Sequence, residues 1–422
     1  MTRFNVRPIR CDTPQALRAA MESLGCDPRG IRIMLPKGRF FLLRADGVPF
    51  AAASILKQEM LSKGGEAALS GEIYYGGERT TGVLLMGTER TFKRVLRVLA
   101  AQPLPSLREL GNELASVLRS WQQPEYSDLQ IGDRCFVWGE RTYVMGIVNV
   151  TPDSFSGDGL LPSDASDTEV IRAAVSQALL FLEQGADLID IGGESTRPGS
   201  EPIDAKTEMG RIVPVIEALR AQTRAPISVD TYKAAVAQAA LDVGADMVND
   251  VWGLQMDPAM APLVAERQVP VIIMHNRSKP RNAAQEQRLG GRYVGIAYEN
   301  LMGDIIRELR AQVDRGMAAG IARERMIVDP GIGFGKTVAQ NLYLLNHVDE
   351  LRALGLPILL GPSRKSFIGY TLDLPPDERL EGTAAAVAIG ILRRGCDIVR
   401  VHDVQAMVRV VRMTDAILRA EV

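Results

Sequence analysis

One unit recurs along the last two-thirds of the chain: a helical segment ends at a glycine, a short polar step follows, and an apolar strand leads into a polar loop. The clearest copies are EQGADLIDIGG around Gly185, LDVGADMVNDVWG around Gly244 and RRGCDIVRVHDV around Gly395. Glycine suits this place because the residue after a helix end commonly needs a positive φ. Short, continuous apolar strands are typical of a parallel sheet buried on both faces. The repeat therefore indicates alternating strands and helices.

The number of these strands distinguishes between two folds. Eight can be counted over roughly 290 residues, which is near the usual size of a (β/α)₈ barrel. We expect them at 143–148, 188–191, 227–229, 247–249, 269–274, 326–328, 358–360 and 398–401. A doubly wound open sheet would usually carry a glycine-rich dinucleotide turn after its first strand. Here that turn is NVTPDSF, so the sequence favours an α/β fold with a (β/α)₈ TIM barrel at 129–422.

The N-terminal segment 1–121 follows a different pattern, and 422 residues are too many for one ordinary domain. Apolar runs predict strands at 38–44 and 81–85. Apolar residues at three- and four-residue steps predict helices at 89–101 and 107–121. We therefore expect an additional small N-terminal α/β or α+β domain of unknown role, joined to the barrel by the polar linker 122–128.

Composition excludes several classes of partner. The net charge of -2 provides no basic field for nucleic acid. The sequence contains no run of about 18 or more apolar residues, so no membrane span is predicted. The four cysteines have no paired spacing, which favours free thiols in a reducing compartment and a cytoplasmic protein.

The candidate site consists of polar residues at the ends of the predicted strands, because barrel enzymes build their sites at the carboxyl ends of their strands. One such aspartate is often only a helix N-cap. A polar group after all eight strands is harder to explain in that way. These residues are Asn149, Thr196, Arg197, Asp230, Asn249, Asp250, His275, Asn276, Asp329, Arg364, Lys365, Arg400, His402 and Asp403.

The set divides by chemistry into two groups. Carboxylates, an amide and an amine match the donor-rich edge of a heterocycle such as an aminopyrimidinone; this group is Asp230, Asn249, Asp329 and Lys365. Cationic groups with an oxygen ligand suit a pyrophosphate bridged by Mg²⁺; this group is Arg197, Arg400, His402 and Asn149.

Other features carry less weight. The segment DPGIGFGKT resembles a phosphate-binding P-loop, but Pro330 stands where that motif needs glycine. Arg364 could be a surface residue or an ion-pair partner, and His402 alone could be a structural histidine. His347 is expected to be structural, and no catalytic role is expected for His275.

Seven motifs in order resemble those of the dihydropteroate synthases, over residues 129–418. They are MGIVNVTPDSFSGDG, DIGGESTRPGS, SVDTY, VNDVWG, DPGIGFGK, GPSRKSFIG and RVHDV. The resemblance implies that 6-hydroxymethyl-7,8-dihydropterin pyrophosphate condenses with para-aminobenzoate to give 7,8-dihydropteroate and pyrophosphate. It further implies departure of pyrophosphate, attack of the arylamine on a pterin cation, Mg²⁺ as the cofactor, and a homodimer.

The resemblance also assigns residues to three subsites. The pterin site would be Asp230, Asn249, Asp329 and Lys365. The pyrophosphate site would be Asn149 (through Mg²⁺), Arg197, Arg400 and His402, with Asp153 on a mobile loop. The para-aminobenzoate pocket, where sulfonamides would compete, would be Thr196, Pro198, Phe334, Lys365 and Ser366. Catalytic roles would fall to Lys365, Asp230, Asp329 and Arg400.

Two other functions remain as alternatives. A pterin-binding barrel that transfers a methyl group to a corrinoid would share the aspartate and asparagine contacts, but would not need Arg197, Lys365 or Arg400. A scaffold protein would be expected to have lost part of the polar set. For residues 1–121, a fused pyrophosphokinase would require an acidic metal pair and basic residues for ATP. The sequence of this segment contains no convincing cluster of that kind, so an assembly or regulatory role is favoured.

Overall fold

The computed structural model describes residues 4–11, 13–72, 79–122, 126–151, 166–197, 199–286 and 288–420. It divides into two compact units, Met1–Gln123 and Pro124–Val422, which we name the first and the second unit. The division lies inside the segment 122–128, where the sequence predicts a linker. In the described ranges, no helix combines the length and the apolar character needed to cross a membrane.

The first unit is an α+β structure around a small antiparallel sheet. Its described strands pair in the order β1–β3–β2, with Leu42 of β1 opposite Met86 of β3. Alternate residues of β3 are buried, and Leu85 packs with Phe92 of α4 and Leu107 of α5 in one apolar core. The elements are α1 (Pro14–Glu22), α2 (Pro28–Gly38), β1 (Phe40–Pro49), α3 (Phe50–Ser62), β2 (Glu66–Leu69), β3 (Thr80–Thr88), α4 (Glu89–Ala100) and α5 (Pro105–Gln122).

The second unit is the expected (β/α)₈ barrel. Among the described residues, eight parallel strands pair in the order β13–β10–β9–β8–β7–β6–β15–β14. A bridge between Val328 of β13 and Ile358, just before β14, connects the two ends of this order and closes the barrel. The strands are β6 (Tyr143–Asn149), β7 (Leu188–Gly192), β8 (Ile227–Asp230), β9 (Met247–Asp250), β10 (Val271–Met274), β13 (Met326–Asp329), β14 (Leu359–Leu360) and β15 (Ile398–Val401).

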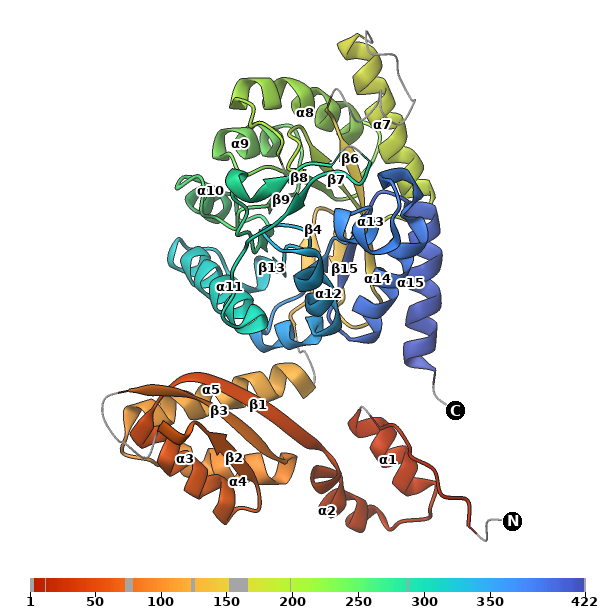
Figure 1. The fold of residues 1–422 in the computed structure, drawn as a ribbon. Helices are drawn as coiled ribbons and strands as arrows, with labels where there is room; N and C mark the ends of the chain where they lie inside the picture. The colour runs from red at the N-terminus through yellow and green to blue at the C-terminus, as the bar shows by residue number, and fades with distance from the viewer. Residues whose placement is uncertain are drawn as a thin grey trace. The chain divides into compact units, whose positions relative to one another are not determined.

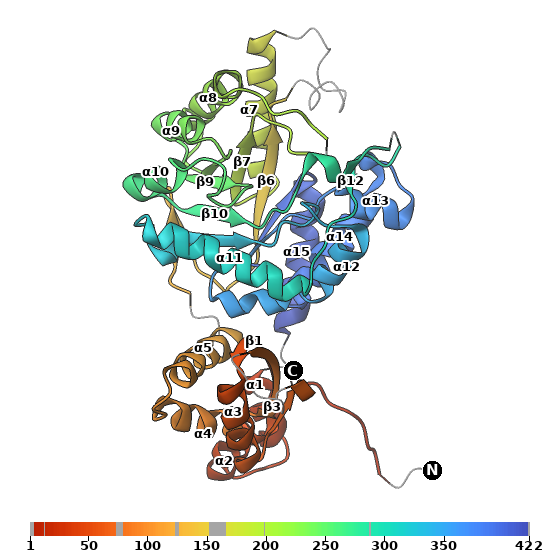
Figure 2. The same cartoon turned by 60° about the vertical axis from the view of Figure 1, so that its left-hand side comes forward.

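Helices surround these strands, as Figure 1 and the turned view in Figure 2 both show. They are α7 (Asp167–Glu183), α8 (Ala205–Arg220), α9 (Ala234–Asp242), α10 (Met260–Arg267), α11 (Leu301–Ala318), α12 (Val338–Asn346), α13 (Ser366–Leu372), α14 (Leu380–Leu392) and α15 (Val404–Arg419). Two short hairpins, β4 (Leu129–Ile131) with β5 (Arg134–Phe136) and β11 (Ala283–Ala284) with β12 (Arg292–Tyr293), complete the described sheets.

Two different physical requirements explain the glycines of the repeated unit. Gly185 and Gly244 follow helix ends with φ of 103° and 110°, as predicted. The prediction was wrong for Gly395, because the positive φ there belongs to Arg394. At Gly395 an added Cβ would lie 2.3 Å from Cγ1 of Val348, so close packing requires the glycine.

The barrel interior contains an apolar layer at its amino end. This layer comprises residues of the strands and of the β4–β5 hairpin, with no residue from the surrounding helices among its buried members. Its strand residues are Tyr143, Met145, Leu188, Met247, Ile272, Ile327, Leu359 and Ile398. Because side chains alternate along a strand, the residue two positions further on faces the same interior. The next layer, toward the carboxyl ends, therefore receives whatever residues follow at that spacing.

Candidate active site

The strand alternation places the polar residues in that next layer. Two positions beyond Leu188, Met247, Ile327 and Ile398 stand Asp190, Asn249, Asp329 and Arg400. Ser228 of β8 is also fully buried, and Asp230 follows it at the same spacing. The barrel thus brings its polar groups together directly above an apolar floor.

Arg400 lies at the centre of this layer. Its Nε donates to Oδ2 of Asp190 at 2.6 Å, and its Nη2 donates to Oδ2 of Asp230 at 2.7 Å. Asn249 Nδ2 donates to the same Asp190 oxygen at 2.9 Å. Four strands are linked in this way, and one carboxylate orients both the guanidinium and the amide.

Asp190 is a site residue that the pattern of polar residues at the strand ends did not indicate. Its side chain is fully buried, and Oδ1 has no hydrogen-bond partner among the described residues. A buried polar atom without a partner is costly, so a ligand donor at that position would be favourable. The available signal was one carboxylate within the otherwise apolar strand LIDIG, two residues beyond Leu188.

Burial shifts the pKa values of the ionisable groups in the site, and the neighbouring charges act with it or against it. Burial raises the pKa of Asp230 to about 7, although Arg400 acts to lower it. Burial also raises the pKa of Asp329, whose Oδ1 accepts a hydrogen bond from the Gly331 amide at 2.7 Å. Burial, reinforced by Arg400, lowers the pKa of Lys365 to about 8 against the opposing charge of Asp329. Lys365 is therefore still mainly a cation at neutral pH.

An aromatic wall forms where two loops meet beside this layer. Nζ of Lys365 lies 4.0 Å from the ring centre of Phe334, a distance at which a cation and a π face attract each other. An added Cβ on Gly333 would lie 3.1 Å from Cδ of Lys365, so these loops are in close contact. Ser366 begins α13 directly after Lys365. Thr196 is half-buried in the loop after β7, whereas Pro198 lies outside the described residues.

A cavity of about 370 Å³ is lined on one part by Asn149, Arg364, His402 and Asp403, and on another by residues of the helices α7 and α15, among them Gln177, Phe181 and Gln405. Oγ of Ser363 accepts the backbone N–H of His402 at 3.1 Å and lies 3.1 Å from Nδ1 of its ring. The serine proton is then available for Nδ1, which leaves the imidazole proton on Nε2. Burial, together with the charge of Arg400, holds the pKa of His402 well below its usual value. His402 is a neutral donor here.

The remaining candidates have different environments. Arg364 is an ion-pair partner, with Nε and Nη2 at 3.0 and 2.6 Å from the carboxylate of Asp403. Arg197 is exposed, and Asp153 lies outside the described residues. Asp250 accepts the backbone amides of the loop after β9, so its role is structural. His347 stacks on Tyr343 with ring centres 4.0 Å apart, as expected of a structural residue.

The comparisons with known proteins agree with this geometry. Residues 145–402 match the model of a family described as pterin binding enzyme. The dihydropteroate synthase of Clostridium beijerinckii is 45% identical over 291 residues, which are 69% of this chain and all of that protein. The structure of Xanthomonas albilineans dihydropteroate synthase with 4-aminobenzoic acid superposes with a TM-score of 0.61 at 39% identity, covering 70% of this chain and all of that one.

A longer relative also covers the first unit. A probable bifunctional folylpolyglutamate synthase/dihydropteroate synthase of Halobacterium salinarum is 40% identical over 406 residues, which are 96% of this chain and 46% of that protein. That match must include most of the first unit. The shorter relative has its full length matched within 69% of this chain. Through the barrel of its second unit, the chain belongs to the dihydropteroate synthase family of pterin-binding enzymes.

Proposed function

We propose that this protein condenses 6-hydroxymethyl-7,8-dihydropterin pyrophosphate with para-aminobenzoate, releasing pyrophosphate and forming 7,8-dihydropteroate. The observation that carries the proposal is the layer of buried polar groups centred on Arg400, at the carboxyl ends of the strands in a barrel of this family. Carboxylates of Asp190, Asp230 and Asp329 can accept hydrogen bonds from the amino group and ring N–H groups of a pterin. The amide of Asn249 can donate and accept beside them.

The leaving group is met by cationic and neutral donors. A guanidinium has five N–H donors, and two of those of Arg400 are given to Asp190 and Asp230. The others, and the Nε2 proton of His402, are suited to the oxygens of a departing pyrophosphate. His402 adds no positive charge before substrate binds, since its pKa is strongly lowered by burial.

Magnesium is part of the proposal. Mg²⁺ commonly binds one or two protein oxygens, several waters and substrate phosphates, so it needs no cluster of acidic ligands. None of the described residues form a group of three or more His, Cys, Asp or Glu side chains suited to a metal ion. The amide oxygen of Asn149, which lines the cavity beside His402, fits such a sparse site. When bound, Mg²⁺ would neutralise charge that develops on the leaving pyrophosphate.

Departure of pyrophosphate leaves a cation on the pterin methylene. In their ionised forms, Asp230 and Asp329 would stabilise positive charge on the adjoining ring. The nitrogen of para-aminobenzoate is already a nucleophile at neutral pH, so no strong general base is required. Phe334, with Lys365 4.0 Å from its ring centre, offers the arylamine an aromatic neighbour, and we assign Thr196 and Ser366 to the same subsite.

The test is turnover of the two substrates with Mg²⁺, measured both as pyrophosphate release and as dihydropteroate formed. We expect activity in the wild type, its loss in Lys365→Ala and Asp230→Asn, and its decrease when a chelator removes Mg²⁺. Sulfonamides should compete with para-aminobenzoate. Methyl transfer from methyltetrahydrofolate to a corrinoid, with no pyrophosphate released, would contradict the proposal.

Assembly and location are also proposed. A homodimer through barrel helices is supported by exposed apolar residues on α14 and α15: Ile389, Leu392, Met413 and Ile417. Light scattering of the purified chain measures its mass directly. A reducing, cytoplasmic location is supported by the thiols of Cys11, Cys26, Cys135 and Cys396, all unpaired. For the first unit we propose an assembly or regulatory role.

A further inference from the structure

The loop between β13 and α12 is pressed against the backbone that follows β10. Gly331, Gly333 and Gly335 of this loop have φ of 67°, 83° and 60°. A Cβ on Gly331 would lie 1.9 Å from the carbonyl oxygen of His275, and one on Gly335 would lie 2.4 Å from the carbonyl carbon of Arg277. The glycines therefore permit a contact that any side chain would prevent.

Lys336, at the end of this loop, is almost completely buried. It belongs to none of the three substrate subsites proposed above. Its ammonium donates to the carbonyl oxygens of Gly331 and Phe334 at 3.0 and 3.1 Å, and to Nδ1 of His275 at 3.0 Å. A lysine ammonium has three donors, and each has an acceptor here. Burial lowers the pKa of Lys336 to about 7 against the opposing charge of Asp329, so the ammonium and the neutral amine are both populated at neutral pH. One side chain thus ties two loop carbonyls to the residue after β10.

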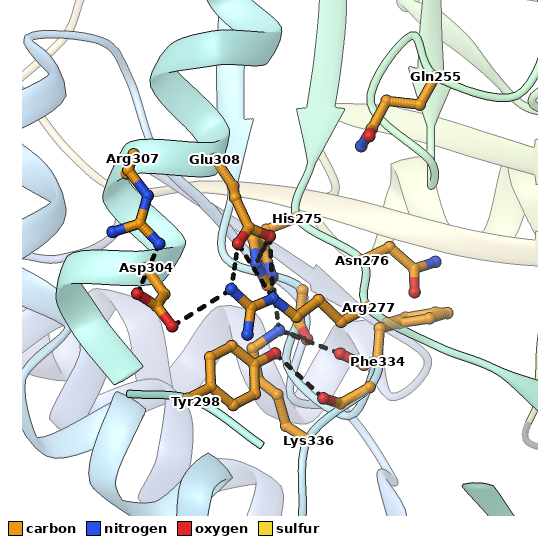
Figure 3. A network of polar contacts seen from close by, with 12 residues as sticks. Gln255, His275, Asn276, Arg277, Tyr298, Asp304, Arg307, Glu308, Phe334 and Lys336 are labelled. Atoms are coloured by element: carbon orange, nitrogen blue, oxygen red, sulfur yellow. Dashed lines mark hydrogen bonds and ion pairs between the residues drawn. The ribbon is translucent and has the colours of Figure 1, made fainter. Parts of the chain in front are cut away.

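His275 continues the connection outward to α11. Because Nδ1 accepts from Lys336, the ring proton is on Nε2, which donates to Oε2 of Glu308 at 3.0 Å. Burial and then the Lys336 charge lower the pKa of His275 to about 4, so the ring is neutral. Nε of Arg277 lies 3.0 Å from both oxygens of Glu308. Figure 3 shows these side chains converging between α11 and the loop.

A second contact supports the same loop from outside. The guanidinium of Arg277 lies over the ring of Tyr298, 4.2 Å from its centre, and the Tyr298 hydroxyl donates to the Gly335 carbonyl at 3.1 Å. Asp304 accepts from both Arg277 and Arg307, at 3.2 and 2.7 Å. Charges alternate along the network, which stabilises it in a low dielectric.

Asp329, just before the loop, and Phe334, within it, are held in different ways. Asp329 belongs to β13, is paired in register with Met274, and bonds to the Gly331 amide. Phe334 lies at the tip of the loop, and its carbonyl is held by Lys336. Loss of the ammonium should therefore displace the aromatic wall more than the pterin-binding carboxylate.

We propose that Lys336 is a positioning residue which, supported by His275 and Glu308, holds Phe334 against Lys365 and so shapes the arylamine subsite. The inference rests on the proposed synthase function. It assigns a role in para-aminobenzoate recognition to three residues that do not touch that substrate.

Steady-state kinetics of Lys336→Met test the proposal. We expect the KM for para-aminobenzoate to rise about tenfold, equivalent to about 1.4 kcal/mol, while the KM for the pterin pyrophosphate changes less than about threefold. His275→Gln retains an acceptor for Lys336 and a donor for Glu308 and should stay near the wild type. His275→Leu retains neither and should resemble Lys336→Met.

Arg352→Met is the matched control. Arg352 is likewise buried, bonds to Asp397 at 2.7 Å, and lies at the amino ends of the strands, since Asp397 immediately precedes β15. The Arg352→Met substitution should lower the melting temperature without changing the KM for para-aminobenzoate. Folded Lys336→Met with a wild-type KM would overturn the inference. If that variant is insoluble, a wild-type KM in His275→Leu would do so.

The outcomes also separate the two proposals. A wild-type protein that forms no dihydropteroate contradicts the proposed function itself. An active wild type with equal KM changes in Lys336→Met and Arg352→Met contradicts only the positioning role, because the effect is then general destabilisation.

Discussion

Replacement of Asp190 by asparagine removes one buried negative charge and nearly preserves the side-chain shape. Removing one partner of a buried ion pair costs about 3–5 kcal/mol. The cost should be smaller here, because Arg400 keeps Asp230 at 2.7 Å and the new amide oxygen can still accept from Asn249. We therefore expect a loss of about 2 kcal/mol, or a melting temperature lowered by about 3 °C for a unit of this size.

Catalysis should suffer more than stability. The amide oxygen in place of Oδ2 can still accept from Nε of Arg400 and from Asn249, but it lacks the negative charge, so the guanidinium and the Asn249 amide are no longer oriented by one charged oxygen. We expect kcat/KM for the pterin pyrophosphate to fall about 100-fold, which is about 2.7 kcal/mol of transition-state stabilisation. Continuous detection of released pyrophosphate measures this constant, and thermal unfolding monitored by circular dichroism measures the stability.

Asp187→Asn provides the control at the opposite end of the same strand. Asp187 is buried and accepts from Arg134 and Arg141 at 2.9 and 2.6 Å, at the amino end of β7. Its replacement should lower stability while kcat/KM stays within about twofold of the wild type. The reasoning is refuted if Asp190→Asn keeps wild-type kcat/KM, or if Asp187→Asn loses as much activity.

Three further outcomes are expected. Gly335→Ala should destabilise the protein by about 2 kcal/mol or more in urea unfolding, because the new Cβ meets the Arg277 backbone at 2.4 Å and φ is 60°; an unchanged urea midpoint would contradict the observed contact. Residues 126–422 alone should keep kcat/KM within about twofold, because a relative matched over its full length covers only 69% of this chain; a large loss would assign the first unit a part in catalysis. The His275 ring should titrate by NMR with a pKa near 4, against 6.5 for the unshifted group. The unfolded state then binds more protons between these values, so this group's contribution to stability is lost as pH falls from about 6.5 to about 4; titration near 6.5 would contradict the buried environment beside Lys336.

Local patterns were sufficient to predict the barrel and much of the site. Apolar runs that end at polar residues predicted all eight barrel strands. Parallel strands are buried on both faces, so almost every residue in them is apolar and the run is visible in the sequence. Asp230, Asn249, Asp329 and Arg400 were selected because each stands at a strand end. In the first unit, α4 and α5 were predicted from clear amphipathic spacing. Helix α3 was missed because its own apolar residues lie around most of its circumference, so it shows little amphipathic contrast between an apolar and a polar face.

Tertiary structure alone decided which polar groups meet. Asp190 and Arg400 are 210 residues apart in the chain, and only closure of the barrel at a defined register brings them within 2.6 Å. The same holds for Lys336, which the sequence presents as part of a glycine-rich loop, and for His275, 61 residues before it. Composition and periodicity along the chain determined the elements of the fold, since secondary structure depends on near neighbours. The partners of buried charges depend on packing between distant strands, which no local pattern contains.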